Sequence, residues 1–144
     1  MVKIKVYLAG GIHQKDFEDA NSWRTRATIE LNKYGFKVIN PLRNRDWIQA
    51  SEQNQFTVNE IVHRDVKDIT VSHILLVELE DANRNYIGTT TEMTLARMMN
   101  KLIIVFTGNR EYSPWVDFLA TKVVSSLEEA LEYIRITLGD ETIW

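Results

Sequence analysis

The feature that most constrains the fold is a regular alternation of short apolar runs with segments of helical periodicity. Apolar runs of strand length lie at 4–9, 36–39, 74–79, 102–106 and 122–124. Each is followed by a helical pattern: about 16–34, 57–70, 90–100, a segment that opens at 113–114 and one that follows 125–126. Strands that alternate with helices predict a parallel sheet covered by helices on both faces.

Right-handed crossovers leave few topologies for five such units. The run at 74–79 is the most hydrophobic, which favours a central strand covered on both faces. We therefore predict an α/β fold of the flavodoxin-like or Rossmann-like kind, with three layers and the strand order 2-1-3-4-5. Ligands of such sheets bind beyond the carboxyl ends of the strands, near the switch point between the first and third strands. Polar segments fall there at 10–13, 80–91 and 107–109.

In two helical segments the spacing places particular residues on one face of the helix. Over 16–34 the residues that share a face are Trp23, Ala27, Leu31 and Tyr34, and Gly35 is placed to end the helix. Over 57–70 the shared side comprises Val58, Ile61, Val62, Asp65 and Ile69. Residues 43–56 show no clear period, and their length is typical of a functional loop such as a lid.

Length and composition limit the classes of function. With 144 residues, a single domain spanning 1–144 is expected. The chain has no cysteine, which excludes disulfides, thiolate zinc sites and a cysteine nucleophile. A net charge of −3 provides no general attraction to a nucleic acid polymer or an anionic membrane. No signal peptide or membrane span is visible in the pattern, so a cytoplasmic protein is expected.

Three side chains are candidates for chemistry. Glu92 follows Gly88 and a run of threonines at a helix start, where its carboxylate can sit at the mouth of a site. The alternative is that Glu92 is the capping-box partner of Thr89 or Thr90. Asp65 is either a second site carboxylate or a solvated residue that pairs with a neighbouring Arg or Lys. Tyr7 lies near the carboxyl end of the first strand, close to two glycines, and the alternative is a core tyrosine with its hydroxyl at the rim.

Metal and cofactor motifs are weak. The spacing of Asp81, Asn83 and Asn85 with Glu92 imitates a calcium loop, but Tyr86 stands where that loop needs glycine. The three histidines have no metal-ligand spacing, and no glycine-rich nucleotide motif is present. We therefore expect neither a metal nor a cofactor. In the 43–56 loop Trp47 is free to stack on a base, whereas Trp23 is expected to pack in the core.

Four groups of residues stand out together: 6–11, Asn40-Pro41-Leu42, Arg64-Asp65, and 88–93 with Ala96 and Lys101. Over roughly residues 3–134 the chain resembles the nucleoside 2-deoxyribosyltransferase family, which also contains nucleoside 5′-monophosphate N-glycosidases. The resemblance implies a small-molecule substrate: a (deoxy)nucleoside or its monophosphate, together with a free base. Cleavage would proceed through a covalent glycosyl-enzyme intermediate.

The resemblance also implies roles for individual residues. Glu92 would be the nucleophile, Asp65 would transfer a proton or position the base, and Tyr7 would hold the nucleophile by a hydrogen bond. Residues expected to bind substrate are Gly10, Gly11, Ile12, Gly88, Thr89, Asp81 and Trp47. The small size of the chain, exposed apolar groups at 113–115 and the terminal Trp144 further predict a homo-oligomer.

The chain departs from the family pattern at three positions. Transferases usually carry an aspartate six residues before the nucleophile, where it contacts the base, and here that residue is Tyr86. His73 and Thr94 replace an aspartate and a glycine that are common in the family. The change at 86 is more compatible with a hydrolase than with base exchange. A non-catalytic nucleotide-binding module and a flavodoxin-like protein of another activity stay open as alternatives.

Overall fold

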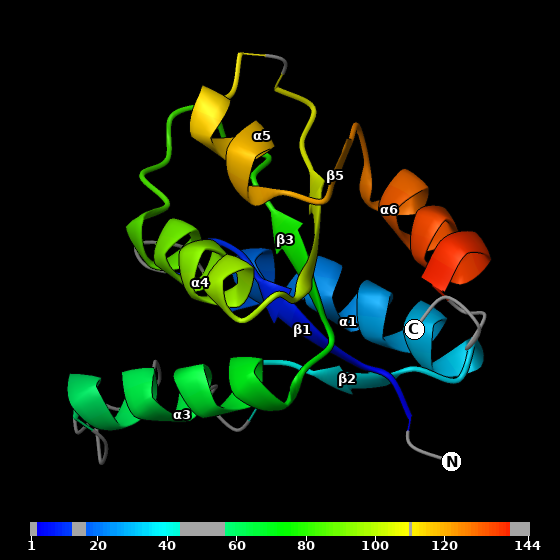
Figure 1. Cartoon of the computed structure of the whole chain (residues 1–144), viewed down its shortest axis with the longest axis horizontal. Coiled ribbons are helices and arrows are strands. Elements are labelled where there is room, and N and C mark those ends of the chain that lie inside the picture. Colours follow the sequence, from blue (N-terminus) through cyan, green and yellow to red (C-terminus); the bar gives the residue numbers. More distant parts are fainter. Residues whose placement is uncertain (1–2, 13–16, 44–56, 110, 139–144) are drawn as a thin grey trace.

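The computed structural model describes residues 3–12, 17–43, 57–109 and 111–138, which contain a five-stranded sheet with helices on both faces (Figure 1). The strands are β1 (Lys5–Ala9), β2 (Lys37–Ile39), β3 (Ile74–Glu78), β4 (Leu102–Phe106) and β5 (Lys122–Val124). All neighbouring strands pair in parallel, in the order β2-β1-β3-β4-β5. The predicted α/β fold and strand order are confirmed.

The helices form two layers that bury alternate strand residues. They are α1 (Phe17–Lys33), α3 (Val58–Val71), α4 (Ile87–Met98), α5 (Pro114–Leu119) and α6 (Leu127–Tyr133), which continues into the π-helical segment η1 (Ile134–Leu138). Successive side chains of a strand point to opposite faces of the sheet. Val6 and Leu8 therefore pack in a core with α1 and α6, whereas Tyr7 and Ala9 pack in a second core with α3, α4 and α5.

The helix ends follow the local chemistry of the sequence. Gly35 has a φ of +88° after α1, and the N–H of Phe36 donates to the carbonyl of Leu31 at 3.1 Å, which closes a Schellman motif. Ser113 caps α5 ahead of Pro114, as the sequence predicts, and its side chain accepts from the N–H of Trp115.

The predicted helix faces need two corrections. Tyr34 lies just past the end of α1 and does not share its buried side, because 44% of its surface is exposed. Arg24, which the pattern did not mark, is instead fully buried because its guanidinium finds backbone carbonyls to bind. In α3, only Ile69 of the predicted side is buried, and Val58 and Val62 are exposed because the outer end of this helix extends past the sheet (Figure 1).

Helix α4 begins at Ile87 rather than at the predicted Thr90. The N-cap residue, Tyr86, makes no side-chain cap bond. The threonine hydroxyls turn back into the helix instead, because Thr90 donates to the carbonyl of Tyr86 at 2.9 Å and Thr91 to that of Ile87 at 2.7 Å. The threonine run is thus part of the helix, and its Thr90 and Thr91 hydroxyls are committed to backbone carbonyls.

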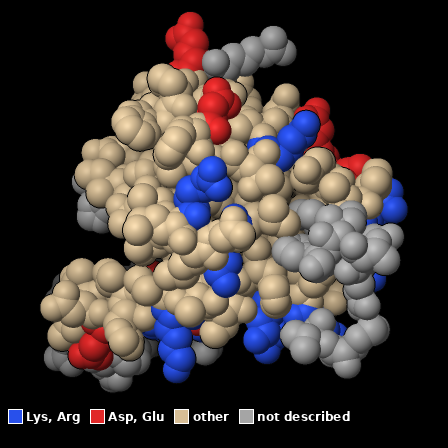
Figure 2. All heavy atoms as spheres, viewed as in Figure 1, with Lys and Arg blue, Asp and Glu red and all other residues tan. Residues whose placement is uncertain are grey.

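Charged side chains are scattered over the face shown in Figure 2, and α4 and α5 carry the exposed Arg97 and Asp117. Within the described part of the chain, no helix is long and apolar enough to cross a membrane. The predicted loop at 43–56 falls outside the described residues except for Arg43.

Candidate active site

A hollow of about 280 Å³ lies at the carboxyl edge of the sheet, beside the switch point between β1 and β3. It is lined by Gly10, Gly11, Ile12, Asp65, Arg84, Asn85, Tyr86, Gly88, Thr89 and Glu92. Its volume is close to the lower end of the range for small-molecule sites, about 300 Å³. This cavity is referred to as the hollow.

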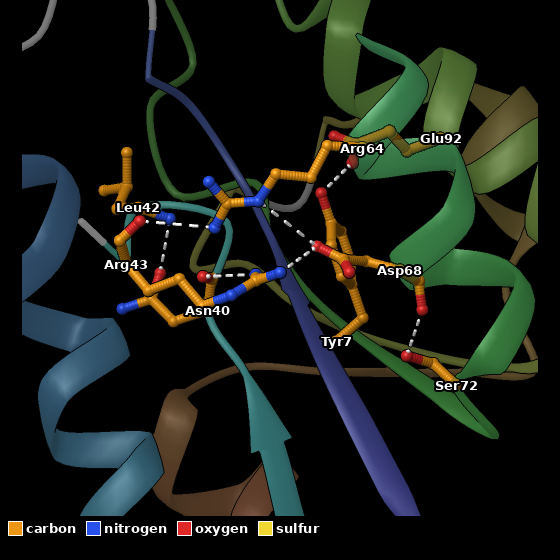
Figure 3. A network of polar contacts seen from close by, with 8 residues as sticks. All are labelled: Tyr7, Asn40, Leu42, Arg43, Arg64, Asp68, Ser72 and Glu92. Atoms are coloured by element: carbon orange, nitrogen blue, oxygen red, sulfur yellow. Dashed lines mark hydrogen bonds and ion pairs between the residues drawn. The ribbon is translucent and has the colours of Figure 1, made fainter. Parts of the chain in front are cut away.

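Glu92 enters the hollow from α4 and is held by Tyr7 (Figure 3). Tyr7 is fully buried, and its place on β1 turns it towards α4, where its hydroxyl donates to Oε2 of Glu92. Burial raises the pKa of Tyr7 well above its ordinary value, and the charges of Glu92 and Asp65 raise it further. The phenol therefore stays protonated and acts as a donor.

The alternative role of Glu92 in a capping box is wrong. Because α4 begins at Ile87, Glu92 lies beyond its first turn, too far along the helix to reach back to the N-cap residue. Its observed partner is Tyr7, from the central part of the sheet.

Asp65 reaches the same hollow from α3. It is half-buried, and its charge is close enough to contribute to the raised pKa of Tyr7. The tertiary structure thus brings together Tyr7, Asp65 and Glu92, which come from β1, α3 and α4 and lie far apart in the sequence.

A polar network holds α3 beside the loop after β2 (Figure 3). The guanidinium of Arg43 pairs with Oδ2 of Asp68 at 2.8 Å, and Nε of Arg64 lies 3.9 Å from the same oxygen. Arg64 also donates to the carbonyl of Arg43 at 3.2 Å, and Arg43 to the carbonyl of Asn40 at 3.0 Å. These contacts hold the helix that carries Asp65 against the end of β2.

The predicted glycines supply backbone walls. A Cβ atom on Gly10 would lie 3.1 Å from Cβ of Glu78, and one on Gly11 would lie 2.7 Å from Cδ of Arg84. A Cβ on Gly88 would meet nothing within 4 Å, so that side is open. Thr89 and Ile12 also line the hollow, as predicted.

Two other predicted residues are placed differently. Asp81 does not line the hollow; its carboxylate accepts from the N–H of Asn83 at 3.0 Å and lies 3.6 Å from Nε of Arg84. Trp47 lies outside the described residues.

Three lining residues, Arg84, Asn85 and Tyr86, were not among the predicted site residues, although the family pattern puts a base contact at position 86. The polar segment at 80–91 was correctly placed at the switch point, but no local pattern says which of its side chains turn inward. Arg84 is the finding of most consequence, because its side chain is only 17% exposed and provides a cation at the hollow. Among the described residues, no group of three or more His, Asp or Glu side chains is arranged to hold a metal ion.

A model of the family described as "Nucleoside 2-deoxyribosyltransferase like" matches residues 3–109. The chain belongs to this family. The match covers β1 to β4 and every residue that lines the hollow, and it confirms the family that the sequence resembles. No curated protein matches the chain.

Solved structures of similar fold include members of both activity classes. The 2-deoxyribosyltransferase of Bacillus psychrosaccharolyticus is 16% identical, with a TM-score of 0.70 over 90% of this chain and 91% of that chain. A 2-desoxiribosyltransferase from Leishmania mexicana is 15% identical, with a TM-score of 0.69 over 93% and 98%. The CMP N-glycosidase BcmB of Clostridium botulinum is 15% identical, with a TM-score of 0.62 over 90% and 96%. At such identities the likeness shows the shared fold.

Proposed function

We propose that this member of the nucleoside 2-deoxyribosyltransferase-like family cleaves the N-glycosidic bond of (deoxy)nucleosides or their 5′-monophosphates, with Glu92 as the nucleophile. The observation that carries the proposal is the hydrogen bond from the buried Tyr7 to Glu92 inside a hollow that Asp65 also lines. Two carboxyl groups flanking one small site are what cleavage through an oxocarbenium-like transition state requires.

The reaction divides into two displacements at C1′ of the sugar. An oxygen of Glu92 bonds to C1′ while the C1′–N bond breaks, and the electron pair leaves with the base nitrogen. Asp65, when protonated, gives its proton to that nitrogen. Water or a second base then attacks C1′, the glycosyl ester breaks, and Asp65 takes up the proton of the incoming nucleophile.

Tyr7 serves the first displacement by orienting the nucleophile. As a protonated donor it holds Oε2 of Glu92 and directs the other carboxylate oxygen, Oε1, towards the sugar. The loop at Gly10-Gly11 and the first turn of α4 at Gly88 expose backbone rather than side chains, which lets a sugar ring approach closely.

The test is base release from a panel of deoxynucleosides, ribonucleosides and their 5′-monophosphates, with a second free base added or omitted. Glu92→Gln keeps the size of the side chain and removes the nucleophile, so turnover should fall by at least about 1,000-fold while the unfolding temperature changes little. Glu18→Gln, at an exposed position in the first turn of α1, is the matched control and should keep full activity.

An active Glu92→Gln protein would refute the assignment of the nucleophile. If the wild-type protein binds nucleotides saturably and releases no base, the protein is a binding module and the enzymatic proposal fails. A new nucleoside that forms only when the second base is present would identify base transfer, and base release without it would identify hydrolysis.

A second candidate, hydrolysis restricted to 5′-monophosphates, is favoured by Arg84. This side chain places a guanidinium at a hollow that otherwise carries the two carboxyl groups, and a phosphate is a natural partner for it. Arg84→Met should then raise KM for a monophosphate at least about tenfold and leave KM for the unphosphorylated nucleoside unchanged. Equal effects on both substrates would exclude the phosphate contact.

We also propose that the protein is a homo-oligomer. Trp115 and Phe118 of α5 are 69% and 63% exposed, and their rings meet edge to face at 5.9 Å between centroids. They border a groove that continues over Thr90, Thr91 and Thr94 of α4, and none of the described residues that line it is charged. Such a surface is typical of a subunit contact. A monomeric mass by light scattering at working concentration would refute the oligomer.

A further inference from the structure

Tyr86 offers its ring, rather than its hydroxyl, to a ligand in the hollow. The hydroxyl donates to Oε2 of Glu78 at 2.6 Å and accepts from the N–H of Asp81 at 3.0 Å. A phenol oxygen has one proton and two lone pairs, so its only donor and one of its two acceptor positions are occupied. Since Tyr86 lines the hollow, the surface left for a ligand is chiefly aromatic.

Glu78 fixes that ring from outside the hollow. It ends β3, is only 2% exposed and does not line the hollow. One carboxylate oxygen accepts from the N–H of Gly11 at 3.3 Å, and the other accepts from the N–H of Glu80 at 2.6 Å in addition to Tyr86. A single buried carboxylate therefore ties the loop after β1, the loop after β3 and the N-cap of α4 together.

Two further observations show how firmly the ring is held. A Cβ atom on Gly11 would lie 3.2 Å from Cε1 of Tyr86, so the ring packs directly against backbone. Burial raises the pKa of Tyr86 above its ordinary value, and the hydrogen bond to Glu78 raises it further, which keeps the phenol protonated and its bond to the carboxylate intact.

The ring also lies at a useful distance from the nucleophile. Tyr86 is the N-cap of α4 and Glu92 is six residues further on, which corresponds to about 9 Å along a helix axis. A sugar that places C1′ at Glu92 would occupy the space between the two residues. Tyr86 is then within reach of the group attached to C1′.

We propose that Tyr86 is a specificity-determining residue whose ring packs against the planar base of the substrate, and that Glu78 is the positioning residue that holds this ring. This inference rests on the proposed function. An aromatic face stacks on purines and pyrimidines alike, and a phenol whose proton is committed to Glu78 donates no hydrogen bond to a base edge. Tyr86 therefore selects for the presence of a base and contributes little to the choice among bases.

The test measures binding in the absence of turnover, by calorimetry on the Glu92→Gln protein. The ligands are the four common deoxynucleoside 5′-monophosphates and 2-deoxyribose 5-phosphate, which has no base. Tyr86→Ala in this background should weaken all four nucleotides by about tenfold, within the range for loss of one base–aromatic stack, and leave the sugar phosphate within about twofold.

The positioning role is tested with Glu78→Leu, which removes the acceptor, and Tyr86→Phe, which removes the donor; each breaks the bond between the two residues while keeping the ring. Each should raise KM of the active enzyme about threefold with kcat nearly unchanged, and the double variant should be no worse than either single one. The matched control is Tyr112→Phe, because Tyr112 donates at 2.9 Å to Asp117 away from the hollow. It should change neither parameter.

Three results would overturn the inference: unchanged nucleotide binding by Tyr86→Ala, equal weakening of the sugar phosphate, or a loss confined to one base. Additive effects of Glu78→Leu and Tyr86→Phe would remove the positioning role, and if Glu78→Leu does not fold, the Tyr86→Ala comparison still decides the base contact. A wild-type protein that binds nucleotides through Tyr86 but releases no base would refute the proposed function alone. Normal turnover with an unaffected Tyr86→Ala protein would refute this inference alone.

Discussion

Replacement of Arg24 by methionine tests the most unusual feature of the core. Arg24 is a fully buried side chain on α1. Its Nε donates to the carbonyl of Leu8 at 3.4 Å, its Nη2 to that of Gly10 at 3.1 Å, and its Nη1 to that of Ala20. Its guanidinium also lies 4.8 Å from the centroid of the Trp23 ring. Methionine fills a similar length without a donor, so these carbonyls lose the hydrogen bonds from the guanidinium.

The magnitude follows from these bonds. Each lost hydrogen bond from a charged donor costs about 1.5–3 kcal/mol, and removing a cation from the interior returns part of that cost. We expect a net loss of about 3 kcal/mol in the free energy of unfolding. For a chain of this size about 1 kcal/mol corresponds to about 3 °C, so the unfolding temperature should fall by about 10 °C.

The assay is thermal and urea unfolding, with Arg26→Met as the matched control. Arg26 lies two residues further along α1 and pairs with Glu128, and both side chains are 57% exposed. An exposed pair contributes at most about 1 kcal/mol. If Arg24→Met unfolds no more easily than Arg26→Met, the carbonyl bonds of Arg24 do not stabilise the fold and the reasoning fails.

Two further predictions concern stability. Gly35→Ala should lower the free energy of unfolding by about 1 kcal/mol because Gly35 has a φ of +88°. Gly88→Ala should raise it by up to about 1 kcal/mol, because Gly88 lies inside α4 with open space around it. Urea titration measures both changes in the free energy of unfolding, and changes of the same sign would contradict the reasoning. His73 accepts the N–H of Lys5 on Nδ1 at 3.0 Å, and burial foremost, then the charges of Lys101 and Lys5, lower its pKa below 6.5. The unfolded chain then binds this proton more readily, so the contribution of His73 is present above about pH 6.5 and lost as pH falls through the folded pKa. The fall in urea midpoint from about pH 7.5 to about pH 5.5 should therefore be smaller in His73→Asn, and an identical fall would contradict the prediction.

Much of the fold was predictable because the deciding interactions are local or periodic. Period-two alternation in β1 separates Val6 and Leu8 from Tyr7 and Ala9, and the structure places these pairs in the two cores on opposite faces of the sheet. The α1 end at Gly35 and the α5 start at Ser113 depend on backbone conformations that few residues adopt. The parallel order follows because consecutive β/α units have few right-handed arrangements.

Where local signals conflict with tertiary packing, sequence reasoning failed. The threonine run suggested a helix start at Thr90, but α4 extends back to Ile87 because the hydroxyls bond carbonyls inside the helix. Arg24 lies on α1 at a position that the apolar pattern did not mark, yet it is buried, because its partners are carbonyls of β1 and of the loop after it that only folding brings near.

The residues of the candidate site were likewise predictable only in part. From the residues and the family pattern alone, Glu92, Asp65, Tyr7 and the glycine loops could be nominated, because chemistry restricts which side chains can serve as nucleophile, acid and close backbone wall. Only the tertiary structure decided that Arg84 and Tyr86 turn into the hollow and that Asp81 does not line it. The physical reason is that a polar loop has no periodicity to orient its side chains. Their direction is set by distant partners, here the buried carboxylate of Glu78 and the bare backbone of Gly11.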